Sequence, residues 1–148
     1  MFITQTANSA GIYMVRFFLN GQERPVIIDD YLPVYSSGQP AFAKCRDGEL
    51  WVSLLEKAWA KLHGSYARSS GHLPSRAATH IMGVPAENLR HSENIQDPGK
   101  FFERMKEADR RGYTLMAKTP GEGMIKNALG LLSGHVYSVI STFEFYTG

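Results

Sequence analysis

The feature that most constrains the fold is a broad apolar stripe over residues 49–62. Its hydrophobic residues recur at the i, i+3, i+4 and i+7 spacing of a single helix face. They are Leu50, Trp51, Leu54, Leu55, Ala58, Trp59 and Leu62. Asp47 is suited to cap the start of this helix, and Gly64 is suited to end it. We therefore expect an amphipathic helix that needs a covering element, with both tryptophans in the core.

Two segments rich in Ile, Val, Tyr and Phe precede this helix, at residues 11–19 and 25–30. Asn20 and Gly21 lie between them and tolerate the positive φ angles of a tight turn, so we expect a β-hairpin. Residues 64–98 are rich in Gly, Ser, Pro, His and Asn, and we expect them to be irregular.

Three further segments complete the expected elements. An apolar face bounded by charged residues predicts a second helix over residues 97–111, which ends at Gly112. Residues 113–118 are expected to form a short strand, and residues 135–146 a long β-rich run. The chain is therefore predicted to be α+β.

The composition excludes several classes of protein. Lys and Arg total 16 against 14 for Asp and Glu, and a net charge of +2 gives no electrostatic case for nucleic acid. No apolar run approaches the ~20 residues of a membrane span, and the start of the chain lacks the pattern of a secretory signal. One cysteine, Cys45, excludes an internal disulfide framework and a multi-cysteine metal site. We expect a protein of the cytoplasm.

Two side chains are candidates for catalysis on the residues alone. Cys45 lies between Lys44 and Arg46, whose charges favour a thiolate, although a loop thiol without a partner is the plainer interpretation. His135 follows the small residue Gly134 and begins the β-rich run, where an imidazole can project into a cleft. A structural histidine remains the alternative. The five histidines form no His-Glu-x-x-His motif, so zinc is not expected.

The helical segment resembles a signature of the calpain family. It reads Glu49-Leu-Trp-Val-Ser-Leu-Leu-Glu-Lys-Ala-Trp-Ala-Lys-Leu-His-Gly-Ser-Tyr66, where calpains have Glu-Phe-Trp-x-x-Leu-Leu-Glu-Lys-Ala-Tyr-Ala-Lys-x-x-Gly-x-Tyr. Gly134-His-Val-Tyr-Ser-Val139 is similar to the calpain motif around the catalytic histidine. The expected hairpin, with Gly11-Ile-Tyr-Met-Val-Arg-Phe17 and Val26-Ile-Ile-Asp-Asp-Tyr-Leu-Pro33, resembles the one before the calpain helix.

The resemblance implies part of a papain-like catalytic core with two lobes. Residues 1–82 would be the end of the helical cysteine lobe, and residues 83–148 the start of the β-rich histidine lobe. By motif, His135 would be the general acid/base and Gly134 would offer its carbonyl to the substrate. Gly71 would contact the substrate through its backbone. Glu49 matches the glutamate that ligates calcium in the cysteine lobe, since calcium prefers oxygen ligands.

The departures from the family pattern are as informative as the matches. Nothing in the chain resembles the family's Gln-Gly-x-x-Gly-Asp-Cys-Trp segment, which carries the nucleophile, and no Asn follows His135. Cys45 corresponds to a loop before the signature helix. The family's Gly-Gly pair is Gly71 and His72 here, so a side chain could obstruct the substrate.

Two hypotheses follow from this pattern. The chain is expected to be a piece of a calcium-dependent cysteine endopeptidase that contributes His135 and no nucleophile, and is inactive alone. A partner chain could supply the missing lobe halves, and the substrates would be proteins or peptides. The alternative is a non-catalytic calpain-like protein with a binding or regulatory role.

Overall fold

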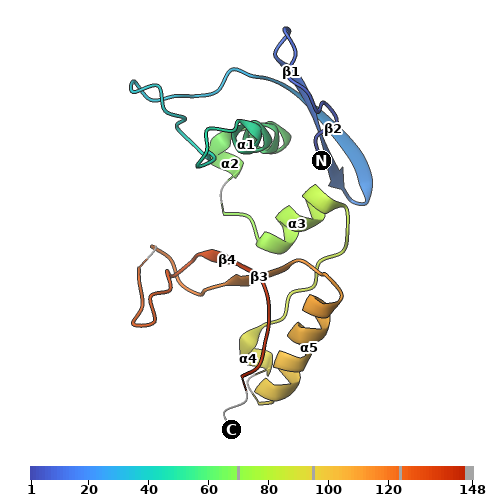
Figure 1. Ribbon diagram of the computed structural model, residues 1–148, viewed down its shortest axis with the longest axis vertical. Coiled ribbons are helices and arrows are strands. Elements are labelled where there is room, and N and C mark those ends of the chain that lie inside the picture. The colour runs from blue at the N-terminus through green and yellow to red at the C-terminus, as the bar shows by residue number, and fades with distance from the viewer. Residues whose placement is uncertain (70, 95, 124, 146–148) are drawn as a thin grey trace. The chain divides into compact units, whose positions relative to one another are not determined.

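The computed structural model describes residues 1–148 except residues 70, 95, 124 and 146–148 (Figure 1). The chain divides into two compact units, Met1–Ala86 and Glu87–Gly148, and each unit is considered by itself. Both units combine helices with strands, which confirms the α+β prediction. The assignment of the units to two catalytic lobes stays a prediction.

A β-hairpin opens the first unit, as expected. Strands β1 (Ile12–Leu19) and β2 (Gln22–Asp29) pair antiparallel, with Val15 opposite Val26. The turn consists of Asn20 and Gly21, at φ 52° and φ 77°. Left-handed backbone at both turn positions matches the twist of the two strands, which is why an Asn-Gly pair suits this turn.

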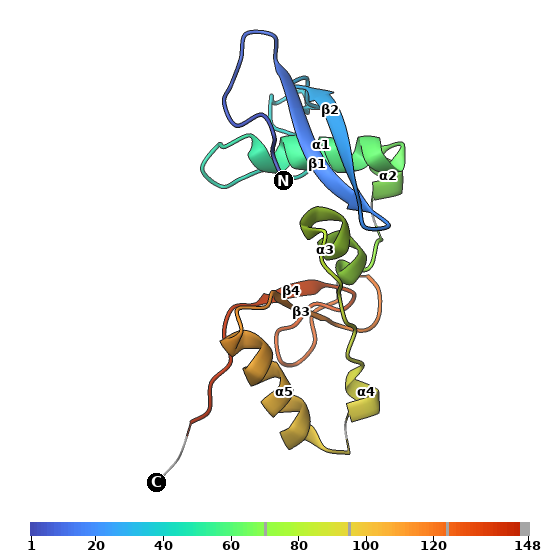
Figure 2. The same cartoon turned by 90° about the vertical axis from the view of Figure 1, so that its right-hand side faces the viewer.

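Helix α1 (Trp51–His63) covers one face of this hairpin (Figure 2). Alternate strand residues point toward the helix, and the apolar stripe of α1 points back at them. The buried core that results consists of Val15, Phe17, Val26, Ile28, Leu54 and Ala58. Gly64 ends α1 in the left-handed conformation at φ 97°, so the predicted helix and its end are confirmed.

The start of α1 differs from the expectation in two respects. Leu50 occupies the N-cap position and no side chain caps the helix, so the prediction of Asp47 as the cap is wrong. Trp51 is 46% exposed, so it is not a core residue. Its ring is in the first helical turn, where its Nε1 donates to Glu49 Oε2 at 2.9 Å. Trp59 packs against the core as expected.

The expectation that residues 64–98 are irregular is wrong. They contain the short helices α2 (Tyr66–Ser69) and α4 (His91–Asn94) and the longer helix α3 (Pro74–Met82). Pro74 marks the first turn of α3, where its missing N–H leaves no hydrogen bond unmade, whereas a proline suggests a break when only the sequence is read.

Gly83 ends α3 and joins the helix closely to β1. Its φ of 72° lies in the left-handed region, and a Cβ atom at this position would lie 2.7 Å from the ring of Phe18. Both the backbone conformation and the close approach therefore require glycine. The position of α3 against the hairpin depends on this contact.

The second unit contains α5 (Pro98–Arg110), β3 (Leu115–Lys118) and β4 (Val136–Val139). Asp97 caps α5 by accepting from the backbone N–H of Lys100 at 2.9 Å. Strands β3 and β4 pair antiparallel, with Leu115 opposite Val139. The strand pairing ends at Val139, so the predicted β-rich run over residues 135–146 is wrong for residues 140–145. Residue 146, the last of that run, lies outside the described residues.

The second unit has no buried residue among those the structure describes, whereas the first unit holds all the buried ones. No helix in the described part of the chain is long and apolar enough to cross a membrane.

Candidate active site

His135 lies immediately before β4, and its main chain is held on both sides by Thr119. The N–H of His135 donates to Thr119 Oγ1 at 3.0 Å, and the N–H of Thr119 donates to the carbonyl oxygen of His135 at 2.9 Å. The two bonds fix the backbone from which the imidazole projects. Residue 119 directly follows β3, so strand pairing places it beside the start of β4.

The backbone conformation at position 134 and the close approach of another segment both require a glycine there. Its φ is 62°, and a Cβ atom there would lie 2.7 Å from the carbonyl oxygen of Gly121. Its N–H donates to the carbonyl oxygen of Pro120 at 3.1 Å. The chain therefore passes close to the 120–121 backbone as it enters β4, which only glycine permits.

The imidazole of His135 is half-buried against one aromatic neighbour. Its ring centroid lies 4.9 Å from that of Tyr137, at an interplanar angle of 75°. The hydroxyl of Tyr137 in turn accepts from the N–H of Leu132 at 2.8 Å. No residue in the described ranges forms a hydrogen bond with either ring nitrogen of His135.

Residues 125–133, in the described part of the loop between β3 and β4, form hydrogen bonds with one another. Asn127 Oδ1 accepts from the N–H groups of Leu129 and Leu131, both at 2.9 Å. The N–H of Ser133 donates to the carbonyl oxygen of Ile125 at 2.9 Å, and the N–H of Ile125 donates to the Ser133 hydroxyl at 2.9 Å. These contacts hold the residues that lie just before Gly134 in the chain, and so they help to set the position of the His135 backbone.

Glu49 and Cys45 lie together in the first unit. Cys45 Sγ is 4.0 Å from Glu49 Oε2, the oxygen that also accepts from Trp51. Calcium takes about 6–8 oxygen ligands. In the part of the chain that is described, no three His, Cys, Asp or Glu side chains are grouped to hold a metal ion. Glu49 could supply one ligand, but the residues present do not form a calcium site.

Gly71 also belongs to the first unit and is exposed. Its φ is 78°, and nothing lies within 4 Å of the position that a Cβ atom would take. The side chain of His72 lies against α1: its ring is 4.4 Å from that of His63 and 5.7 Å from that of Trp59. The imidazole that replaces the family's second glycine is therefore packed on the protein.

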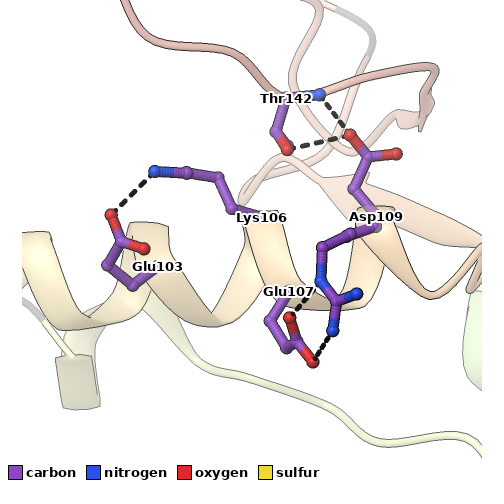
Figure 3. Close-up of a pocket in the computed structure, with 6 residues that line it drawn as sticks. Glu103, Lys106, Glu107, Asp109 and Thr142 are labelled. Atoms are coloured by element: carbon purple, nitrogen blue, oxygen red, sulfur yellow. Dashed lines mark hydrogen bonds and ion pairs between the residues drawn. The ribbon is translucent and has the colours of Figure 1, made fainter.

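A shallow hollow in the second unit contains none of the predicted site residues (Figure 3). It is lined by Glu103, Lys106, Glu107, Asp109, Arg110 and Thr142. Hydrogen bonds from Arg110 and then Arg111 lower the pKa of Glu107 to about 2. Bonds to Glu144 and Glu103 raise the pKa of Lys106. The hollow is a solvated set of ion pairs.

The structure thus brings Gly134 and His135 together in the second unit, and places Glu49, Cys45 and Gly71 in the first. Thr119 and Tyr137 were missed as supports of His135 when only the sequence was read. The available signal was the two-residue alternation that places Tyr137 and His135 on one side of a strand. Thr119 is 16 residues from His135, and only the strand register connects them.

Comparison with known proteins identifies the family. The chain matches the calpain family cysteine protease domain over residues 2–147. It is 40% identical over 148 residues to calpain-type cysteine protease DEK1 of Arabidopsis thaliana, which covers 96% of this chain and 7% of that protein. It is 34% identical over 134 residues to calpain-9 of Mus musculus, which covers 88% of this chain and 19% of that protein. The chain belongs to the calpain family of cysteine proteases.

The chain is much shorter than its relatives. Calpain-A of Drosophila melanogaster is 34% identical over 135 residues, with 89% of this chain and 16% of that protein covered. The chain therefore spans less than a fifth of the length of these curated relatives.

Proposed function

We propose that this chain supplies the general acid/base of a calpain-type cysteine endopeptidase, and that His135 is this residue. The observation that carries the proposal is the fixed backbone of His135 combined with ring nitrogens that have no hydrogen bond in the described part. In this chemistry an imidazole takes the proton of a thiol, and the thiolate attacks the scissile carbonyl carbon. The imidazolium then returns the proton to the amine nitrogen as the C–N bond breaks.

The nucleophilic thiol would come from residues other than those described. Cys45 is in the first unit, where its thiol lies 4.0 Å from Glu49 Oε2 and forms no hydrogen bond with a described histidine of that unit. We therefore propose that His135 acts with a cysteine on another segment or on a partner chain that completes both lobes. Water would then hydrolyse the thioester and release the second product.

The substrate would be a polypeptide held through its backbone. Gly71 is exposed with open space beside its Cα atom, so an extended peptide could approach its main chain closely. Gly134 would offer its carbonyl oxygen next to the imidazole. Both roles rest on glycine positions that lack a side chain to obstruct the peptide.

We also propose that the activity depends on calcium and that the protein lies in the cytoplasm, each on the basis of one residue. Glu49 precedes α1 and would donate one carboxylate oxygen to a calcium ion whose other ligands lie outside the described residues. A chain with one cysteine suits the reducing cytoplasm, where structural disulfides are rare. The predicted boundary between the two lobes, after residue 82, is also part of this proposal.

A non-catalytic binding or regulatory role is the second candidate. It is favoured by one observation within the first unit, namely that the Cys45 thiol lies 4.0 Å from a carboxylate oxygen of Glu49. In this case the chain would bind a partner and hydrolyse nothing.

The test is the turnover of a peptide substrate by a polypeptide that joins this chain to a nucleophilic cysteine. General acid/base catalysis contributes roughly 10²–10⁴-fold, so His135→Ala should lower turnover by at least about a hundredfold. His91→Ala is the matched control, because His91 contacts Phe101 in the same unit and lies outside the site. Turnover of His135→Ala within about tenfold of the unaltered polypeptide would show that His135 is not the acid/base, and no turnover by the unaltered polypeptide would favour the non-catalytic role.

A further inference from the structure

Three histidines from separate parts of the first unit gather around Trp59. His63 is at the end of α1, His72 follows α2, and His80 is in α3. The ring of His63 lies 4.4 Å from Trp59 and 4.4 Å from His72. His80 lies 5.6 Å from Trp59 and stacks on His63 at 5.9 Å. We call these four residues the imidazole cluster.

Two ring nitrogens in the imidazole cluster are buried without a hydrogen bond. They are His63 Nε2 and His80 Nδ1, which have no partner among the described residues. The third ring, that of His72, has a hydrogen-bond partner, because its Nε2 lies 3.0 Å from the carbonyl oxygen of Arg68. A proton added to a buried, unpartnered nitrogen brings a charge that neither water nor an acceptor stabilises.

Every charged or titratable group that acts on these two rings opposes protonation. Burial lowers the pKa of His63, and His72, Arg76 and His80 lower it further. Burial also lowers the pKa of His80, as do Arg76 and His72.

The neighbouring elements do not offset this effect. From β1 the uncharged ring of Phe17 meets Trp59 edge-on at 5.8 Å. The charged residue of that strand, Arg16, is paired with Glu23. At the end of α2, the carbonyl oxygen of Ser69 accepts from Trp59 Nε1 at 3.3 Å. Among the described residues, the charged side chain that acts on both rings is therefore Arg76, whose positive charge opposes their protonation.

We propose that the imidazole cluster is a proton-sensitive clasp: it holds Gly71 and His72 against α1 while His63 and His80 are neutral, and it releases them when either is protonated. The clasp also joins α3 to the end of α1, since His80 and His63 stack. Where Gly71 contacts substrate, acid would loosen that contact. This consequence rests on the proposed function, whereas the clasp itself does not.

The direction of the pH dependence follows from the two histidines. Their pKa values in the folded chain are below the ordinary 6.5 of an unfolded histidine. The unfolded chain therefore binds more protons in this range, and stability is lost as the pH falls. The clasp should be fully formed above pH 6.5 and should weaken as the pH falls below it toward the folded values.

The experiment is an acid titration of this chain in which Trp59 reports on its own surroundings. The chain has two tryptophans, so Trp51→Phe leaves Trp59 as the sole indole emitter. Lowering the pH from about 7.5 to about 5 should shift the emission of Trp59 to the red, with a midpoint below the ordinary histidine value. Ring resonances of His63 and His80, followed by NMR, should titrate together with this shift.

Two comparisons make the result decisive. The double variant His63→Phe with His80→Phe keeps the aromatic packing and removes both protonation sites, so the shift of Trp59 should disappear. His91→Gln, in the second unit, should leave the shift unchanged. A midpoint at or above 6.5 for His63 and His80 would overturn the proposal. So would a shift that persists in a folded double variant. If that variant does not fold, the ring titration of the unaltered chain decides alone.

Discussion

The two units of this chain are ordered by different interactions. In the first unit, six buried residues between the hairpin and α1 form a continuous core. In the second unit no described residue is buried, and the backbone is held instead by hydrogen bonds that its N–H groups donate to the side chains of Thr119, Asn127 and Asp109. Packing therefore holds the unit that carries Gly71 and Glu49, whereas the backbone of His135 is held by a few polar contacts.

The difference is also visible in the exposed side chains. In the second unit, Leu129, Ile140 and Phe145 are 84–93% exposed. Apolar groups at such positions contribute almost nothing to the stability of the unit in which they lie. We expect the unit with the core to resist unfolding and the other to open locally, and the following changes test this contrast in order of effect.

The largest effect should come from removing a core ring. Phe17 is fully buried, so Phe17→Ala should lower the free energy of unfolding by about 3–5 kcal/mol through lost burial and the cavity left behind. Phe145→Ala makes the same change at a ring that is 84% exposed, and should alter it by about 0.5 kcal/mol or less. Urea denaturation of the two variants measures the difference. Equal losses would remove the distinction between the units.

The next effect concerns the link between α5 and the residues after β4. Asp109 Oδ2 accepts from the N–H of Thr142 at 2.7 Å and from its hydroxyl at 2.9 Å (Figure 3). Asp109→Ala should remove most of the hydrogen-exchange protection of the Thr142 amide and leave the hairpin of the first unit unchanged. Glu107→Ala, on the same helix, is the control because Glu107 pairs with Arg110 instead.

The same link should depend on pH in a defined direction. Hydrogen bonds from the Thr142 N–H and then its hydroxyl lower the pKa of Asp109 below 3.8. The link is therefore fully present above pH 3.8 and is lost as the pH falls through the lower folded value. Protection of Thr142 that does not change with acid would contradict this assignment.

A smaller effect is expected at Thr119. Thr119→Val removes the hydroxyl that accepts from the His135 N–H and should cost about 1 kcal/mol of stability. Thr119→Ser keeps the hydroxyl and should restore most of it. Amide exchange at His135 distinguishes the two variants. If valine and serine behave alike, the hydroxyl does not hold this histidine.

The smallest effect is expected for an exposed ion pair. Arg104 and Glu87 lie 2.6 Å apart, with side chains that are 53% and 66% exposed. Solvent screening limits such pairs to roughly 0–1 kcal/mol, so Arg104→Ala should change unfolding little, and less in high salt. A loss as large as that of Phe17→Ala would mean that charge pairs replace a core in the second unit.

The sequence predicted those parts of the fold whose signal is local. The hairpin follows from an Asn-Gly pair between two β-rich segments, and α1 from an apolar stripe that Gly64 ends. Helix α3 was missed because Pro74 suggests a break when its place in the first turn is not known. The strand after His135 was overextended, since β-propensity cannot show that pairing stops at Val139, opposite the first residue of β3.

For the candidate site too, the sequence predicted what depends on local signals and missed contacts between distant segments. His135 and Gly134 were predicted as site residues from a short motif, and the structure shows the hydrogen bonds that hold their backbone. The histidines at 63, 72 and 80 could not be grouped from their spacing, because loops and two helices bring them to Trp59. Contacts between distant segments carry no periodic signal, so only the fold shows them.

The most direct test of the central claim, that His135 pairs with a nucleophilic thiol, is the rate of thiol alkylation. The polypeptide would join this chain to the nucleophilic cysteine and carry Cys45→Ala, so that one thiol is measured. An imidazolium partner keeps a thiol ionised well below its ordinary pKa of about 8.5, so iodoacetamide should react rapidly at about pH 6. His135→Ala should abolish this low-pH reactivity, and His91→Ala should keep it. Equal rates at low pH with and without the His135 imidazole would contradict the account.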